Sequence, residues 1–550
     1  MSESLRLRVV SRAEEWSESS HDVVIGKDIL ELLSTSMYVD PMTVYREYVQ
    51  NAADSIDHAR ERGLLAASEG SVRIHLDPVA RAITIRDDGA SISASDFVER
   101  LTNLGSSRKR GTSARGFRGV GRLAGLGYCQ ELVFRGRTDG EDKVSELRWD
   151  GRALKALLRT ADHGKNLRAL VKDVVTVRQV KAVDEPARFF EVQMRGVIRH
   201  RDDRLLSDSA VADYLSQVAP LPFSPDFSFA NRINAALEAS VRLGHLSVYI
   251  NDGPDRLYRP FQDEIKVDGK TEAAFTNLEI RNLIGMDGSI GAVAWVLHHE
   301  YSGALSNRAL IKGLRLRSGN IQVGDHTLLE HLFPETRFNS WAVGEVHIVD
   351  PRILANGRRD NFEHSVHLDN VLNQLAPIAR EIARNCRQSS ISRKWQREFE
   401  LHRESAFEQA KAVARGGITR ASRQAHIDAA LKSLKSMKKV LETRHLDDEV
   451  RAHLGERAVA AESRVNKMLG QGAAMSDPLE ALPAPKRVAY QHVISLIYEC
   501  SANRGAAGAL VVRLLARLSE QTTAKSVKGK RLASRGKREE HTKHLPAKKK

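Results

Sequence analysis

The chain has 550 residues, with 85 Lys and Arg against 70 Asp and Glu, and carries a formal net charge of +15. A chain of this length is expected to fold as roughly three or four domains. Its three cysteines are widely spaced, which excludes a disulfide framework and a cysteine metal site and predicts a reducing, cytoplasmic compartment. The first residues are charged and no apolar run approaches about 18 residues, so we expect neither a signal peptide nor a membrane span.

The first informative element is a predicted helix over residues 43–58, where apolar residues recur every four positions. Glu47, Asn51 and Asp54 stand at i, i+4 and i+7, so their side chains share one face of this helix. A carboxylate on that face can polarise a water molecule, and an amide oxygen can hold a hard cation such as Mg²⁺. An ordinary solvent-facing helix would carry the same three residues, so the helix alone does not define a site.

A predicted β-hairpin follows, with strands over residues 71–76 and 82–86 in which apolar and polar side chains alternate. Asp87 lies where the second strand ends, and Gly89 allows the backbone to turn sharply beside it. A carboxylate at a strand end can accept a hydrogen bond from an exocyclic amine such as that of adenine. A simple Asp-Asp-Gly turn is the alternative interpretation.

A polar, basic loop over residues 101–112 leads into a glycine-rich segment that contains Gly116, Gly119 and Gly121. Such glycines let backbone N–H groups converge on an anion, and the helix that follows presents its N-terminus to it. Lys109 and its basic neighbours add positive charge. The same glycines fit a loose dinucleotide-binding fingerprint, but that motif should follow a buried strand directly, and here it follows the basic loop.

Beyond a proline-rich linker at residues 220–225, short alternating runs predict a second domain that contains a sheet. These runs cover residues 246–251, 291–297, 314–316 and 343–349. From about residue 368 the pattern becomes helical as far as residue 521, with a break near residues 470–485. Residues 522–550 carry 11 Lys or Arg against two Glu, a net charge of +9. This basic tail is predicted to be disordered, and it either solubilises the chain or contacts nucleic acid or another polyanion weakly.

In this order, the acid–amide helix, the Asp-x-Gly turn and the glycine-rich loop resemble the GHKL superfamily of ATPases, whose members include gyrase B, MutL, histidine kinases and the ninety-kilodalton heat-shock chaperones. The chaperone branch is the most similar. Its helix motif, Glu-x-x-x-Asn-Ala-x-Asp, is matched by Glu47, Asn51, Ala52 and Asp54. Its lid begins Asn-Leu-Gly with a Lys six residues after the Asn, which is matched by Asn103, Leu104, Gly105 and Lys109. Its phosphate loop, Gly-x-x-Gly-x-Gly, is matched by Gly116, Gly119 and Gly121.

A separate match lies far downstream. The middle domain of the chaperones has a Val-Asp pair followed by Asn-x-x-Arg-acid-x-apolar, whose Arg reaches the terminal phosphate. Here Val349 and Asp350 precede residues 356–362, in which Arg359 takes the place of that Arg. The combined resemblance spans roughly residues 25–362.

The chain also departs from the chaperone pattern. The second glycine after the Asp-x-Gly turn is Ser91, which constrains the backbone there. The lid is much shorter than in the chaperones. The Gly-Thr strand that closes the adenine pocket is missing, and the nearest strand, residues 189–194, lacks the Thr.

The resemblance implies an α+β protein that binds and hydrolyses ATP with Mg²⁺ and couples turnover to a conformational cycle. Its parts would be a Bergerat-fold ATP-binding sandwich over residues 1–200, an α/β middle, transducer-like domain over 215–367, a helical C-terminal region over 368–521 and the disordered basic tail over 522–550.

The resemblance also assigns roles to residues. Glu47 would orient and deprotonate the attacking water, and Arg359 would arrive from the second domain to offset charge on the transferred phosphoryl group. Asn51 would hold Mg²⁺ and Asp87 would bind adenine. The other nucleotide-binding positions would be Asp54, Gly89, Asn103, Lys109, Gly116, Gly119, Val120 and Gly121.

Our main hypothesis from the sequence is a chaperone-like remodeller of client proteins that forms a homodimer through its C-terminal helices. Two alternatives from other classes stay open at this point. One is a nucleic-acid clamp of the MutL or gyrase B kind, for which the basic tail is the positive hint. The other is an ATP-gated signalling or defence module that rarely turns over.

Overall fold

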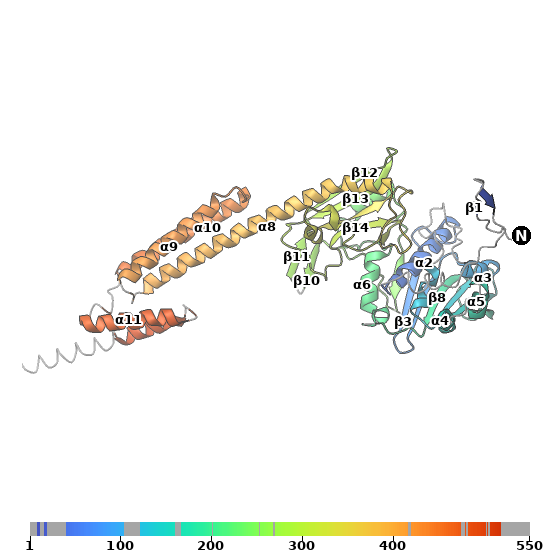
Figure 1. Cartoon of the computed structure of the whole chain (residues 1–550), viewed down its shortest axis with the longest axis horizontal. Helices are drawn as coiled ribbons and strands as arrows, with labels where there is room; N and C mark the ends of the chain where they lie inside the picture. Colours follow the sequence, from blue (N-terminus) through green and yellow to red (C-terminus); the bar gives the residue numbers. More distant parts are fainter. Residues whose placement is uncertain are drawn as a thin grey trace, which may run out of the picture. The chain divides into compact units, whose positions relative to one another are not determined.

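The computed structural model describes residues 8–10, 16–18, 40–103, 121–159, 167–200, 202–251, 253–267, 270–415, 418, 420–474, 479, 482–501, 503 and 506–518. The chain forms two compact units, Met1–Cys386 and Arg387–Lys550. The first unit contains sheets covered by helices and the second is helical, so the predicted α+β class is confirmed (Figure 1). A short hairpin of β1 (Arg8–Val10) and β2 (Trp16–Glu18) precedes the main elements.

The first sheet has seven strands in the order β7-β6-β5-β8-β4-β3-β9. Neighbouring strands are antiparallel except β3 and β9, which run parallel. The strands are β3 (Ser71–Asp77), β4 (Ala82–Asp87), β5 (Glu131–Arg137), β6 (Lys143–Asp150), β7 (Val175–Lys181), β8 (Phe189–Arg195) and β9 (Ser247–Ile250). The predicted hairpin is confirmed as β3 and β4, and its alternating pattern buries Ile83 and Ile85 on one face.

Helices cover that apolar face and share one core with it. They are α2 (Thr43–Glu61), α3 (Ala94–Thr102), η2 (Gly121–Gly127), α4 (Gly151–Arg159), α5 (Leu167–Val174) and α6 (Asp208–Val218). The predicted helix over residues 43–58 is confirmed as α2, and each residue of its four-residue apolar repeat is buried. The hydroxyl of Tyr48 accepts a hydrogen bond from the amide of Gly125 at 2.9 Å and donates to the carbonyl of Arg122 at 3.2 Å. These bonds tie η2 to α2.

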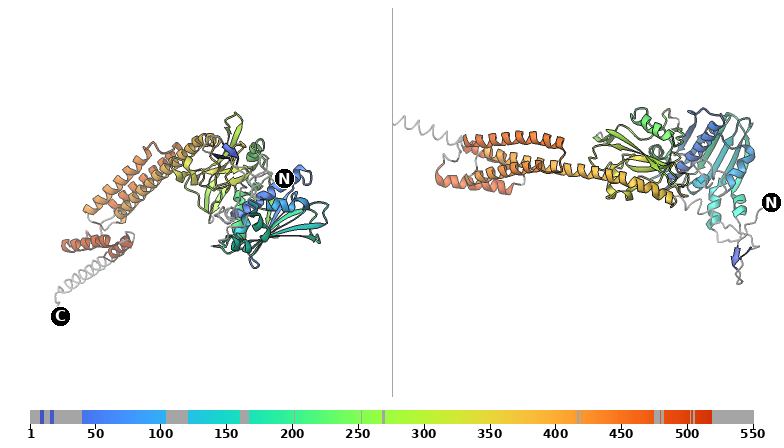
Figure 2. Two further views of the ribbon diagram at one scale, coloured as in Figure 1. Left: turned by 45° about the vertical axis from the view of Figure 1, so that its right-hand side comes forward. Right: turned by 90° about the horizontal axis from the view of Figure 1, so that it is seen from above.

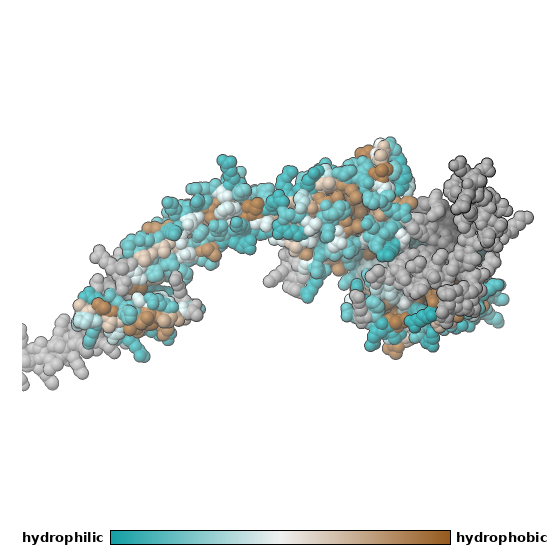
Figure 3. All heavy atoms as spheres, in the orientation of Figure 1, coloured by the Kyte–Doolittle hydropathy of each residue, from teal (hydrophilic) through white to brown (hydrophobic). Residues whose placement is uncertain are grey.

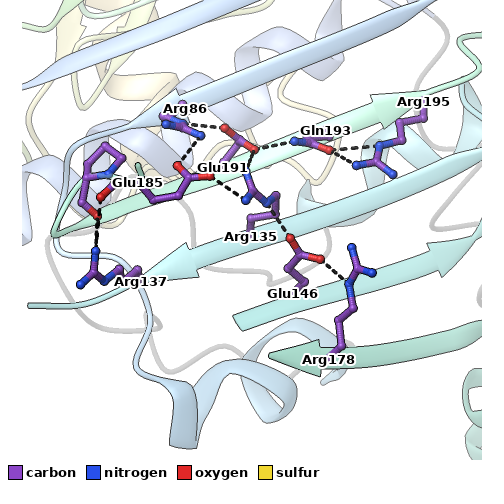
Figure 4. Close-up of polar contacts among 10 residues, drawn as sticks. Arg86, Arg135, Arg137, Glu146, Arg178, Glu185, Glu191, Gln193 and Arg195 are labelled. Atoms are coloured by element: carbon purple, nitrogen blue, oxygen red, sulfur yellow. Dashed lines mark hydrogen bonds and ion pairs between the residues drawn. The ribbon is translucent and has the colours of Figure 1, made fainter. Parts of the chain in front are cut away.

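The opposite face of the sheet carries a ladder of alternating charges across five strands (Figure 4). Arg178 on β7 pairs with Glu146 on β6 at 2.6 Å, and Glu146 pairs with Arg135 on β5 at 2.8 Å. Arg135 reaches Glu191 on β8 at 3.0 Å, and Glu191 pairs with Arg86 on β4. Cross-strand pairs of opposite charge stabilise the register of a sheet, so this face is structural and polar where the other is apolar.

The second sheet has five strands in the order β12-β13-β16-β14-β15. They are β12 (Asn277–Ile284), β13 (Ile290–His298), β14 (Gly313–Ser318), β15 (Ile321–Val323) and β16 (Val343–Ile348). Alternate residues of β13 enter two separate cores, so both faces of this sheet are covered. One core includes the start of α8 (Val366–Arg415) and the other includes α7 (Ala230–Glu238). A hairpin of β10 (Glu264–Val267) and β11 (Lys270–Ala274) adjoins this sheet in the chain.

The prediction for the strand over residues 246–251 was wrong about its sheet. The alternating run 246–251 was expected in the second domain, but β9 pairs with β3 at the edge of the first sheet. The amide of Leu246 donates to the carbonyl of Pro220, and the amide of Asn251 donates to that of Ile74. Alternation shows that a segment is a half-buried strand, but it does not show which sheet has a free edge to accept it.

The second unit is helical, as predicted. Its elements are the later part of α8, α9 (Arg420–Leu441), α10 (Asp448–Ala474), α11 (Ala484–Cys500) and a helical segment over residues 506–518. α8, α9 and α10 pack around one apolar core and lie side by side in both views of Figure 2. Among the described residues, no helix combines the length and apolar character needed to cross a membrane.

Candidate functional site

Glu47 lies on α2 at the point where η2 begins. Its side chain is buried, with a relative exposure of 7% for the residue. A Cβ atom built at Gly121 would overlap Oε2 of Glu47, so only glycine lets the chain approach the carboxylate this closely. Gly121 therefore has a packing reason to be glycine in addition to its predicted contact with phosphate.

The structure brings Arg359 of the second sheet's loop region to Glu47. Nε of Arg359 lies 3.9 Å from Oε1 of Glu47, and the guanidinium of Arg46 lies 3.7 Å from the same oxygen. Arg46 also donates to the carbonyls of Arg358 at 2.7 Å and Arg359 at 3.3 Å. The backbone of Arg359 adopts a left-handed conformation with φ of 57°, which is uncommon for a residue with a side chain and often marks a functional site.

Both cations lie beyond hydrogen-bonding distance of the carboxylate. Among the described residues, Oε1 of Glu47 is buried with no hydrogen-bond partner, as is Oε1 of Gln50 one turn further along α2. A buried carboxylate oxygen of this kind normally finds a polar partner, so the geometry suits a bound water or ligand group. Asn51 and Asp54 lie on the same helix and are partly buried.

Asp87 lies at the end of β4, buried beneath the turn that follows. Its Oδ1 accepts a hydrogen bond from the amide of Gly89 at 3.0 Å. Burial raises the pKa of Asp87 to about 7, although hydrogen bonds from Gly89 and Ser55 act in the opposite direction. A Cβ atom at Gly89 would lie 2.6 Å from the backbone carbon of Ser55, so this position also requires glycine.

The neighbouring carboxylate has a different role. Asp88 accepts hydrogen bonds from the amide of Ser71 at 2.8 Å and from its hydroxyl at 2.7 Å. It therefore fastens the start of β3. Of the two adjacent carboxylates, Asp87 is the one held inside the helix-covered core, and Asp88 closes the hairpin.

Ser91 stands where the chaperone pattern has its second glycine after the Asp-x-Gly turn. Its backbone takes a conformation that glycine would favour, with φ of 61°. Its hydroxyl donates to the carbonyl of Phe189 at 2.7 Å, which offsets part of the strain. Phe190 lies opposite Asp87 in the β4–β8 pairing. The strand over residues 189–194, the nearest candidate for the missing Gly-Thr strand, is thus the direct neighbour of Asp87.

Not every predicted residue is brought into this group. Asn103 is exposed at the end of α3, where its amide nitrogen lies 3.5 Å from Oε1 of Glu99. Lys109, Gly116, Gly119 and Val120 lie outside the described residues. Within the described part of the chain, no group of three or more His, Cys, Asp or Glu side chains could hold a metal ion.

Sequence reasoning missed Arg46 and Ser55, both on α2. Arg46 precedes Glu47 directly, and its burial at 7% exposure is the signal that sets it apart from surface arginines. Ser55 lies two turns beyond Glu47, where its hydroxyl also reaches the amide of Ser91 at 3.4 Å. The contact of Arg46 with the Arg359 loop and that of Ser55 with Asp87 could not be predicted from the sequence, because both depend on which segments pack against α2.

Residues 41–163 match the model of a family described as Histidine kinase-, DNA gyrase B-, and HSP90-like ATPase. This part of the chain, which carries α2, the Asp87 turn and η2, is therefore similar to the GHKL ATPases, and the predicted resemblance is confirmed. The match does not extend to the Arg359 segment.

Among curated proteins, the chain is similar to Chaperone protein HtpG from several bacteria. It is 28% identical to that of Polaromonas naphthalenivorans over 139 residues, which is 22% of each chain. It is 31% identical to that of Halorhodospira halophila over 104 residues, 18% of this chain and 16% of the relative. It is 36% identical to that of Chlorobium phaeovibrioides over 92 residues, 16% of this chain and 14% of the relative. The matched part thus spans only 14–22% of the length of these relatives.

Proposed function

We propose that this chain binds and hydrolyses ATP at the face of α2 and uses the cycle to remodel client proteins as a chaperone-like machine. The observation that carries the proposal is the position of Arg359. The guanidinium of Arg359, in the loop between β16 and α8, lies 3.9 Å from the buried carboxylate of Glu47. Glu47 lies inside the segment that matches the ATPase family model.

The described residues fit an ATP site in two respects. Asp87 is a buried carboxylate with a pKa raised to about 7, and an amine donor from adenine would supply the partner that its ionised form needs. Glu47 keeps a buried oxygen without a hydrogen-bond partner among the described residues, where an attacking water could be oriented. The donor set suits a purine nucleotide better than a metal centre.

In this mechanism Glu47 holds the attacking water and accepts its proton. Arg359 offsets the negative charge that develops on the transferred phosphoryl group, and Arg46 holds the Arg359 backbone in place. Asn51 would hold Mg²⁺, which when bound neutralises charge on the phosphates. Lys109, Gly116, Gly119, Val120 and Gly121 are proposed to bind the phosphates, with Asp54, Gly89 and Asn103 at the edge of the nucleotide.

The remodelling role rests on the similarity to proteins named as chaperones. A homodimer held by the C-terminal helices is part of the same proposal. α11 and the helical segment 506–518 keep apolar side chains exposed, and Figure 3 shows brown patches over this region. They are Val488, Val493, Leu496, Leu510 and Val512. A second copy of the chain could cover them.

Arg359→Ala tests the proposal at its main observation. We expect phosphate release to fall by roughly 10²-fold or more, because an arginine that stabilises transition-state charge is worth at least this much. Affinity for ADP should stay unchanged, since ADP lacks the phosphate that Arg359 reaches. Arg358→Ala is the matched control, because the Arg358 side chain is exposed and only its carbonyl contacts Arg46. Equal turnover in both variants would remove Arg359 from the mechanism.

The kind of molecule on which the chain acts can be tested by measuring which candidate stimulates its ATP hydrolysis. A client remodeller should hydrolyse ATP faster in the presence of an unfolded protein and not in the presence of duplex DNA. Stimulation by DNA alone would favour the nucleic-acid clamp, and turnover insensitive to both would favour the signalling module.

A further inference from the structure

The chain passes between the first and second sheets three times, and these crossings lie close together. Leu221 belongs to the first core and Phe223 to the second, so the first crossing lies between them. The second runs from Leu243 back to Leu246, and the third runs from Leu257 forward to Phe261.

A fully buried ion cluster on the second sheet binds these crossings. Glu345 on β16 pairs with Arg259 at 2.7 Å and with Arg317 on β14 at 2.9 Å, and all three side chains are 1% exposed. His347 donates from Nε2 to Glu345 at 3.0 Å, and Asn320 accepts from Arg259. Burial lowers the pKa of His347 to about 4, so its imidazole is neutral and the cluster holds its charge on two arginines and one glutamate.

Other donors of the cluster go to backbone carbonyls at or next to the crossings. Arg259 donates to the carbonyl of Leu221 at 3.0 Å, and Asn320 donates to that of Leu243 at 2.7 Å. Arg317 donates to the carbonyls of Gln217 and Ala219 at the end of α6, at 2.9 and 2.8 Å. Each crossing is therefore held by a buried charged or amide group, and separating the sheets would leave these groups unpaired.

A second line of hydrogen bonds runs from α6 to the Arg359 loop. Arg315 on β14 donates to the side-chain oxygens of Gln217 and Gln322, each at 3.0 Å. Gln322 donates to the carbonyl of Gly324 at 3.0 Å, and the amide of Gly324 donates to the carbonyl of Arg359 at 2.9 Å. α6 contacts α2 as well as β15, so this line connects the helix that carries Glu47 with the backbone of Arg359.

We propose that the Glu345 cluster and the Arg315–Gln322 line are positioning groups that lock the two sheets together and keep Arg359 beside Glu47 throughout the nucleotide cycle. The expected effect on ATP turnover rests on the proposed ATPase function, whereas the locking of the two sheets does not. This lock differs from the expectation that Arg359 arrives from the second domain during the conformational cycle. The movement that ATP drives must then lie elsewhere in the chain or between protomers.

The distance between the sheets tests the lock without any need for activity. Val79 on the β3–β4 turn and Met286 on the β12–β13 turn are 96% and 60% exposed, so Val79→Cys and Met286→Cys can carry spin labels, with the exposed Cys500 replaced by Ser. In the full chain, diluted with unlabelled protein, we expect one narrow distance distribution that ADP and a non-hydrolysable ATP analogue leave unchanged. A broad distribution, or a shift with nucleotide, would overturn the proposal.

Glu345→Gln should broaden that distribution, because it removes the charge that both arginines share. Glu191→Gln is the matched control: Glu191 is also buried between two arginines, but on the outer face of the first sheet. A folded Glu345→Gln variant that keeps the narrow distance would contradict the lock.

Gln322→Met provides a test that leaves the residues of the Glu345 cluster unchanged. It preserves side-chain size and removes both hydrogen bonds of Gln322 in this line, the one from Arg315 and the one to Gly324. Turnover should therefore fall about tenfold or more while ADP affinity stays within about twofold. Unchanged turnover in Gln322→Met would remove the positioning role. If the wild-type chain shows no turnover at all, the ATPase proposal fails while the distance measurements still decide whether the sheets are locked.

Discussion

Glu47 and Asp87 are both buried carboxylates, but their surroundings give them different chemistry. Glu47 lies between two guanidinium groups that stay beyond hydrogen-bonding distance. Asp87 is held by the hydroxyl of Ser55 and the amide of Gly89, and Arg188 acts on it only as its weakest electrostatic influence. The first environment suits a base that works on water, and the second suits a carboxylate that waits for a hydrogen-bond donor.

Replacing Glu47 should separate binding from turnover. Glu47→Ala is expected to leave ATP affinity nearly intact and to lower phosphate release by about 10²-fold or more, the usual loss for a general base. Calorimetry and a phosphate-release assay on one preparation measure the two steps. Glu61→Ala on the same helix is the control, because Glu61 is exposed and pairs with Arg242. Turnover at the wild-type rate in Glu47→Ala would exclude Glu47 as the base.

Asp87→Asn should abolish nucleotide binding. The adenine amine would then face a neutral amide in place of a carboxylate that accepts its hydrogen bond. A mispaired buried polar group costs about 1–3 kcal/mol. ADP binding by calorimetry is the measurement. Asp88→Asn is the neighbouring control, since that carboxylate bonds Ser71 in the hairpin. Both variants binding ADP equally well would argue against the adenine contact.

The same variant should change the pH dependence of stability. The pKa of Asp87 is raised from 3.8 to about 7 in the folded state, so its contribution to stability is full below about pH 4 and is lost as pH rises through about 7. Asparagine has no proton to lose. The free energy of unfolding of Asp87→Asn relative to wild type should therefore rise between pH 4 and 7, by on the order of 1 kcal/mol or more. Denaturant unfolding at pH 5 and pH 8 would show this, and a constant difference would contradict the raised pKa.

At the scale of elements, α2 organises the site because three other segments pack against it. η2 approaches it at Gly121, the Asp87 turn approaches it at Gly89, and the carbonyls of the Arg359 loop receive Arg46. Most residues of α2 are buried, so its polar side chains have room only where a neighbouring segment leaves a gap. Arg46 and Glu47 lie at such a place.

Gly121→Ala tests the contact between η2 and α2. The added Cβ would overlap only the end of the Glu47 side chain, which can rotate, so stability should change little. The displaced carboxylate should lose its alignment with water, and turnover should fall about tenfold or more. Gly303→Ala is the control, because a Cβ there meets nothing within 4 Å. A variant with normal turnover would show that Glu47 does not need this close approach.

At the scale of the whole molecule, the two units make separate contributions. The first holds the candidate ATP site within one compact unit, and the second offers helices with exposed apolar residues. The basic tail carries a net charge of +9, so the rest of the chain contributes only +6 of the total of +15.

Truncation after Gln521 should keep the proposed homodimer and the basal turnover. It should remove retention on DNA or RNA, because contacts made by charge alone are lost with the tail and weaken steeply between low and physiological salt. Light scattering and binding at two salt concentrations measure both effects. A full-length chain that is monomeric at micromolar concentration would exclude the dimer, and DNA binding that survives truncation would favour the nucleic-acid clamp.

The sequence by itself determined the resemblance to the GHKL ATPases, the α+β class, the α2 helix and the β3–β4 hairpin. Those features depend on local periodicity and on residues close together in the chain, such as Glu47 and Asn51 on one helix face. It also selected Arg359 from a short motif, without any means of telling how near it lies to Glu47.

Only the tertiary structure decided which sheet β9 joins and what lies around Glu47. Arg46, Gly121 and Arg359 meet there from three separate segments, and their distances depend on packing that no local pattern encodes. The Glu345 cluster shows the same limit. No motif in the sequence marks its charged residues, and they form a lock only because three chain crossings bring backbone carbonyls to one buried place.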